Sequence, residues 1–170
     1  HRNVAVGTSA MTNSRDALEN TAIGNYVLME NRQGDNNTAA GSSALRGNAD
    51  GTNNVAVGII SLTQNTTSID TIPISNGGLG YTVANVVISA PVVAADPNNN
   101  SLQATATATI GGGGAITGIT IIEAGKGYSS YLPPTAIITG DGSGAILTVT
   151  LTSGENNTAI GAAALATNRT

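Results

Sequence analysis

The chain has 170 residues, which is room for one ordinary domain or two small ones and excludes a large multidomain enzyme. Charged residues make up 9% and aromatic residues 2%, so a thick aromatic core is excluded and the remaining Gly, Ala, Thr, Asn, Val and Ile indicate thin, repetitive β structure. A net charge of -4 with six Lys and Arg in all argues against nucleic-acid binding, and the absence of cysteine excludes disulfides and thiolate metal sites. Since no apolar run reaches about 18 residues, we also expect no membrane insertion.

A five-residue frame of Asn, a short apolar stretch centred on Ala, and Gly recurs from the first residues onward. Its first four copies are spaced by 17 residues, and a fifth lies near the end of the chain: Asn3–Gly7, Asn20–Gly24, Asn37–Gly41, Asn54–Gly58 and Asn157–Gly161. Eight residues after each Asn comes an apolar residue: Met11, Leu28, Leu45, Leu62 and Leu165. Eleven residues after it comes a small polar residue: Ser14, Asn31, Asn48, Asn65 and Asn168.

Each 17-residue unit predicts a strand, a turn at Gly, a second short strand and a polar turn, which together make one coil of a β-roll. One coil cannot bury its own apolar residues, so the coils must stack, and Asn at the same place in successive coils can form a hydrogen-bonded ladder. The central alanines share one face of the strands, where we expect another backbone to pack closely. These small residues and the shortage of large apolar side chains predict a homotrimer.

Residues 66–155 follow a different pattern and predict a duplicated all-β module of about six strands. Two matching segments, Gly78–Tyr81 and Gly125–Tyr128, are 47 residues apart. The expected strands are 69–74, 86–88 and 104–110 in the first half, and 116–122, 136–138 and 145–151 in the second. The chain therefore divides into roll repeats at 1–65, an inserted module at 66–155 and a fifth repeat at 156–170. We expect the chain to leave and re-enter the roll at neighbouring points.

The repeated frame resembles those of phage tail-fibre proteins and, with a different unit length, the head repeats of trimeric autotransporter adhesins. The insert, with Gly-x-Gly-Tyr and Gly142-Ser143-Gly144-Ala145, is similar to modules of phage structural proteins. The resemblance implies an all-β, β-roll or β-helical trimeric fibre of 17-residue coils interrupted by a duplicated β module. It specifies no receptor.

Candidate chemical sites are sparse, and we predict no enzyme, catalytic residue, cofactor or metal site. The acidic residues lie mostly beside Gly or Asn in turns, where Asp is common anyway: Asp16, Glu19, Glu30, Asp35, Asp50, Asp70, Asp96, Glu123, Asp141 and Glu155. The segment 141–144 lacks the alternating ligands of a calcium loop, and 111–114 lacks the Lys-Ser/Thr of a phosphate loop, so a hairpin turn is the better interpretation. Tyr26, Tyr81, Tyr128 and Tyr131 could stack on sugars, although Tyr81 and Tyr128 occupy equivalent places that favour a structural role.

The leading functional interpretation is a structural segment of a trimeric virion fibre, a stiff spacer that presents host-binding parts. Its partners would be two further copies, other virion or fibre proteins, and a cell-surface glycan or protein receptor. Its location would be an extracellular particle. One alternative is the head of a trimeric adhesin on a bacterial surface, and a tailspike-like polysaccharide depolymerase is a weaker one because the chain lacks an obvious acid cluster.

Overall fold

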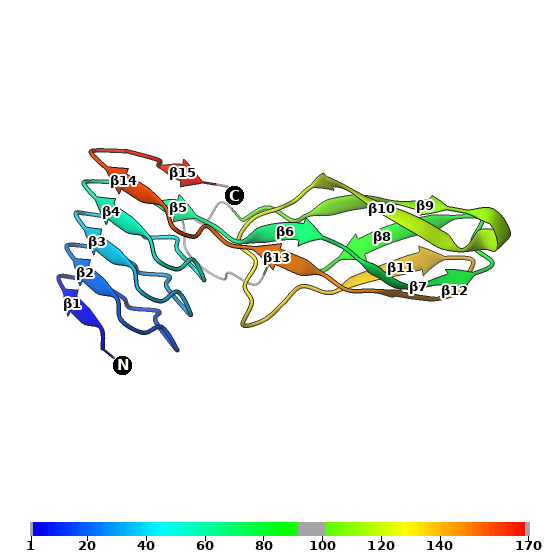
Figure 1. Cartoon of the computed structure of the whole chain (residues 1–170), viewed down its shortest axis with the longest axis horizontal. Coiled ribbons are helices and arrows are strands. Elements are labelled where there is room, and N and C mark those ends of the chain that lie inside the picture. Colours follow the sequence, from blue (N-terminus) through cyan, green and yellow to red (C-terminus); the bar gives the residue numbers. More distant parts are fainter. Residues whose placement is uncertain (1, 92–100, 169–170) are drawn as a thin grey trace. The chain divides into compact units, whose positions relative to one another are not determined.

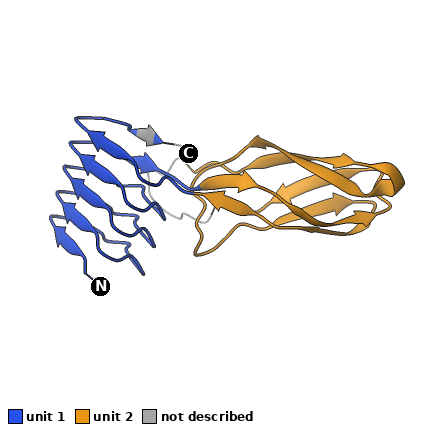
Figure 2. Ribbon diagram, in the orientation of Figure 1, with its two compact units in different colours: residues 1–67, 153–170 blue, residues 68–152 orange. Residues whose placement is uncertain are grey.

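The computed structural model describes residues 2–91 and 101–168, and the chain forms two compact units (Figure 2). Unit 1 consists of residues 1–67 and 153–170, and unit 2 consists of residues 68–152. The expected all-β fold with stacked parallel coils of about 17 residues is confirmed. In the described residues each sheet contains strands of one unit only, so the insert does not continue the winding of the roll.

Unit 1 is built around one parallel sheet to which each coil contributes a three-residue strand (Figure 1). In sheet order these strands are β1 (Val4–Val6), β2 (Thr21–Ile23), β3 (Thr38–Ala40), β4 (Val55–Val57) and β14 (Thr158–Ile160). Their register places the central alanines opposite one another throughout, as the 17-residue repeat requires. A smaller parallel pair joins β5 (Gln64–Asn65) to β15 (Thr167–Asn168). The chain therefore leaves the roll after β5 and rejoins it nearby, since Asn65 Nδ2 donates to Gly154 O at 2.7 Å.

The alanines face the core of their own chain and not a second copy, which corrects their use as evidence for a trimer. Ala22, Ala39 and Ala56 are fully buried and pack with Leu28 and Leu45 in one apolar cluster. Only a small side chain fits between the strand and the opposite wall of so narrow a coil. The alanines therefore give no support to trimer formation, and an interface made by this sheet would use its other face.

The second apolar stretch of each coil is not a strand, so that expectation was wrong. The apolar residues expected to end it have left-handed backbone, with φ between 46° and 53°: Met11, Leu28, Leu45, Leu62 and Leu165. This conformation costs a non-glycine residue about 1 kcal/mol. Burial of the Leu side chains in the middle of the stack and hydrogen bonds between coils, such as Leu28 N to Ala44 O at 3.2 Å, offset that cost.

Two ladders of buried asparagines hold the coils in register, as the repeat predicted. In the first, the side-chain oxygen of Asn20 accepts from Asn37 N at 2.8 Å, and that of Asn37 accepts from Asn54 N at 3.0 Å. In the second, Asn48 Nδ2 donates to Asn31 Oδ1 at 2.8 Å and Asn65 Nδ2 donates to Asn48 Oδ1 at 2.6 Å. Buried amides must be paired, so a slip of one coil past another would leave several of them unsatisfied.

Unit 2 contains more strands than expected, because each of two predicted strands is divided. The described strands are β6 (Ser68–Thr71), β7 (Ile74–Leu79), β8 (Ala84–Ile88), β9 (Thr105–Ile110), β10 (Ile116–Glu123), β11 (Ala136–Gly140), β12 (Ser143–Leu147) and β13 (Thr150–Thr152). Pro73 lies between β6 and β7, and because proline has no backbone N–H to donate to a neighbouring strand, it interrupts the predicted strand there. The sheets have the orders β10-β9-β8-β11, β12-β7 and β13-β6, and residues including Ile69, Ile88 and Tyr128 form their shared core.

Candidate interaction surfaces

The most distinctive surface of unit 1 is the outward side of the β1-β2-β3-β4-β14 sheet, which we call the outer sheet face. It carries the residues that flank each central Ala: Val4, Val6, Thr21, Ile23, Thr38, Ala40, Val55, Val57, Thr158 and Ile160. None of these ten residues is charged, and Val6 and Ile160 are 57% and 71% exposed. A surface of aligned residues that are nearly all β-branched and carry no charge is typical of a sheet that another layer covers.

A trimer interface predicted from the alanines leaves out these flanking residues. The sequence did indicate which face is buried, because Leu or Met recurs once per coil and can cover only one side of a three-residue strand. The small alanine fits under that Leu, which leaves the larger β-branched residues for the outside.

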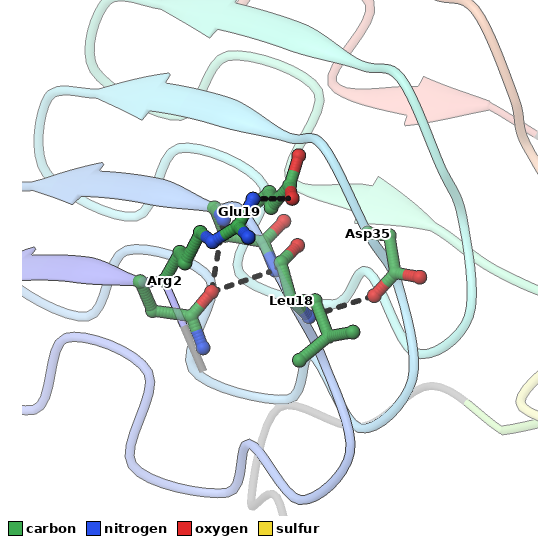
Figure 3. Close-up of polar contacts among 6 residues, drawn as sticks. Arg2, Leu18, Glu19 and Asp35 are labelled. Carbon is green, nitrogen blue, oxygen red and sulfur yellow. Dashed lines mark hydrogen bonds and ion pairs between the residues drawn. The ribbon is translucent and has the colours of Figure 1, made fainter.

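Two of the acidic residues, Glu19 and Asp35, make polar contacts between coils of unit 1 (Figure 3). Arg2 Nη1 lies 3.0 Å from Glu19 Oε1, and the side-chain carboxylate of Asp35 accepts from Leu18 N at 2.7 Å. Both members of the Arg2–Glu19 pair are largely exposed, and exposed pairs contribute at most about 1 kcal/mol. The contact between Leu18 and Asp35 joins one coil to the next, which is a structural role.

The other acidic residues are dispersed over both units. Glu30 is buried and accepts from Asn13 Nδ2 at 2.9 Å, while Glu155 accepts from Ser153 Oγ at 3.1 Å. Asp50 is buried, and Asp16, Asp70 and Glu123 are exposed. Asp96 lies outside the described residues. Within residues 2–91 and 101–168, no three His, Cys, Asp or Glu side chains lie close enough together to hold a metal ion.

Asp141, which directly follows β11, is hydrogen-bonded to the turn after β7. Its carboxylate accepts from Thr82 N at 2.9 Å, from Val83 N at 3.0 Å and from the Thr82 hydroxyl at 2.5 Å. The Thr82 hydroxyl first, and then the two amides, hold the pKa of Asp141 well below its usual range. The carboxylate thus has partners within the protein.

The four tyrosines divide into two buried and two exposed residues. Tyr81 and Tyr128 are 4% and 1% exposed, so neither ring is available to stack on a sugar. Tyr128 Oη accepts from Ala104 N at 2.8 Å and donates to Ser89 O at 3.2 Å, and burial raises its pKa. Tyr26 and Tyr131 are exposed, and the guanidinium carbon of Arg46 lies 5.8 Å from the centroid of the Tyr26 ring.

Residues 111–114 form the hairpin turn between β9 and β10, as expected. Gly112–Gly114 make one turn of 3-10 helix, and the hairpin closes with Gly111 N donating to Ala115 O at 2.8 Å. A Cβ on Gly112 or Gly113 would meet no atom within 4 Å.

Comparison with protein-family models, with curated proteins and with solved structures found no match to this chain. In the part of the chain that the structure describes, no helix is long and apolar enough to cross a membrane.

Proposed function

We propose that this chain is a structural segment of a homotrimeric virion fibre, such as a phage tail fibre, in which it acts as a stiff spacer. The observation that carries the proposal is the uncharged outer sheet face described above, in which seven of the ten residues are Val, Ile or Ala. An exposed sheet surface of this composition needs a partner, and three copies of one flat face can surround a common axis with closed symmetry.

The internal order of the roll supports the role of a spacer. Every coil is joined to the next by parallel strands and by the first asparagine ladder, and the second ladder joins the second to fifth coils, so bending between coils would break several paired groups at once. Each coil adds about 4.8 Å of length along the stack. Repetition therefore produces length and stiffness without a thick core.

The trimer is tested by light scattering, which should give about three times the chain mass of 16.7 kDa. Val57→Lys places a charge on the outer sheet face, and we expect it to reduce the measured mass to that of one chain. Leu79→Lys is the matched control, because Leu79 is an exposed apolar residue of unit 2 and its replacement should leave the trimer intact. A stable, folded wild-type monomer would refute the trimer.

In this proposal the chain lies on an extracellular particle, beside other fibre proteins and near parts that contact a cell-surface glycan or protein. Immunoelectron microscopy with an antibody against this chain should label fibres on virus particles. Labelling of the bacterial surface instead would favour a trimeric adhesin head, and the trimer itself would then remain valid.

A further inference from the structure

Unit 2 is made of two sequence-related halves, and each half forms most of its strand pairs with the other. The first half holds β6 to β9 and the second holds β10 to β13. The pairs β6-β13, β7-β12, β8-β11 and β9-β10 all join one half to the other. Among the described strand pairs of unit 2, only β8-β9 lies within a half. A half by itself would therefore leave nearly all of its strand edges unpaired.

The register of β8 and β11 shows that the halves are related by an internal twofold axis. The duplication makes Val87 equivalent to Ile137, because each is the middle residue of the matching segments 86–88 and 136–138. In the antiparallel pair, Val87 lies directly opposite Ile137. Equivalent residues that face each other across two antiparallel strands mark the position of a twofold axis.

Contacts elsewhere in unit 2 obey the same symmetry. Ile69 N donates to Ala124 O at 3.0 Å, and the equivalent residues 47 positions away, Ile116 and Gly77, are also in close contact, since a Cβ on Gly77 would lie 2.5 Å from Ile116 O.

The two Gly-x-Gly-Tyr segments are likewise packed reciprocally. A Cβ on Gly78 would lie 2.6 Å from Ala145 N of the second half, and a Cβ on Gly125 would lie 2.8 Å from Ala104 N of the first half. Each segment therefore fits against the last part of the other half.

We propose that the two halves are complementary binding partners, so that the first half of one chain pairs with the second half of another copy. Within unit 2 the halves are linked covalently by the four-glycine turn at 111–114, and their other ends both return to the roll, near Asn65 and Gly154. Extending the turn would let each half pair with another copy while both stay attached to their own roll. The exchanged assembly makes the same strand pairs as the closed one. Exchange would join copies of the chain through unit 2, separately from the outer sheet face.

Cysteine pairing tests the exchange, because the chain has no cysteine of its own. Asn85 lies opposite Thr139 of the other half and also opposite Thr107 of its own half, and all three are exposed. Directly opposed residues in antiparallel strands are about 5 Å apart at Cα, within the range of a disulfide. One chain carries Asn85→Cys, and a second, differently tagged chain carries Thr139→Cys.

The two chains are unfolded together, refolded at high concentration and oxidised. We expect an interchain disulfide at a level several-fold above that of the control pair, Asn85→Cys with Thr107→Cys. In the control, positions 85 and 107 belong to the same half, so each cysteine faces a residue of its own chain whether or not halves exchange. Chains folded separately and then mixed should give no more disulfide than the control.

A second pair of variants, Val87→Cys and Ile137→Cys, repeats the test at the twofold axis if the first pair does not refold. Interchain disulfide at the level of the control in chains that refold would overturn the proposal.

Discussion

The replacement Asn37→Ala tests whether the buried asparagine ladder holds the coils together. Asn37 is fully buried in the middle of the stack. Its Oδ1 accepts from Asn54 N and from Asn54 Nδ2, both at 3.0 Å, and its Nδ2 donates to Gly51 O at 2.9 Å. Alanine removes all three of these hydrogen bonds but keeps the backbone bond from Asn37 N to Asn20 Oδ1.

The expected cost follows from what each lost bond leaves behind. Gly51 O keeps a hydrogen bond from Asn48 Nδ2, and Asn54 Nδ2 keeps its bond to Gly154 O, so neither group is left without a partner. Asn54 N, however, becomes a buried donor with no acceptor. Three lost bonds at about 1 kcal/mol each, and at least about 1 kcal/mol more for the unpaired amide, lead us to expect that Asn37→Ala lowers the free energy of unfolding by about 4 kcal/mol.

The matched control is Asn157→Ala, which removes the same amide from the fifth coil. There Nδ2 donates one hydrogen bond, to Asn54 Oδ1 at 3.1 Å, and Oδ1 accepts none from the described residues. We expect a loss of about 1 kcal/mol. Urea unfolding followed by far-ultraviolet circular dichroism measures both variants. If Asn37→Ala costs no more than Asn157→Ala, the buried ladder does not stabilise the stack.

Three further changes test other parts of the structure. Gly41→Val should lower the free energy of unfolding by more than about 1 kcal/mol, because φ is 125° and the new Cβ would lie 2.5 Å from a neighbouring carbonyl oxygen. Gly161→Ala has the same φ but no atom within 3.8 Å of the new Cβ, so it should lower the free energy of unfolding less. Melting temperatures compare the two variants. Tyr128→Phe removes two hydrogen bonds of a buried hydroxyl and should cost about 1 to 3 kcal/mol in urea unfolding; an unchanged midpoint would contradict its structural role. Because the pKa of Asp141 is lowered in the folded protein, its carboxylate stabilises unit 2 at pH values above the unfolded pKa of about 3.9, and this stabilisation is lost as the pH falls below that value. Asp141→Asn should therefore make the urea midpoint depend less on pH between neutral and acidic conditions.

The division of the chain into two kinds of β structure could be predicted from the sequence because it depends on period. A frame repeated every 17 residues places equal residues at equal positions of successive coils, and buried amides such as Asn20, Asn37 and Asn54 pair only in that register. The duplication of the insert was visible for the same reason. Neither conclusion required knowledge of which distant strands meet.

The direction in which side chains point was decided by the tertiary structure. A three-residue strand such as Thr21–Ile23 has two faces, and local sequence does not say which one turns inward. The coil is narrow, and Ala22 packs with Leu28 in its buried core. The β-branched residues therefore lie on the outer sheet face, which is why the candidate interface lies there and not at the alanines. Leu28 likewise adopts a left-handed backbone that no local preference of leucine predicts, because burial and hydrogen bonds to the next coil outweigh its cost.

The pairing of the insert was also decided only in three dimensions. Two similar halves could each close on themselves or pair with one another, and both choices bury the same kinds of residues. The structure pairs them with one another, and Val87 opposite Ile137 identifies the axis. Sequence by itself thus determined the repeats and the register within the roll, since these follow from spacing along the chain. Which face is exposed and which half pairs with which depended on packing between residues far apart in the sequence.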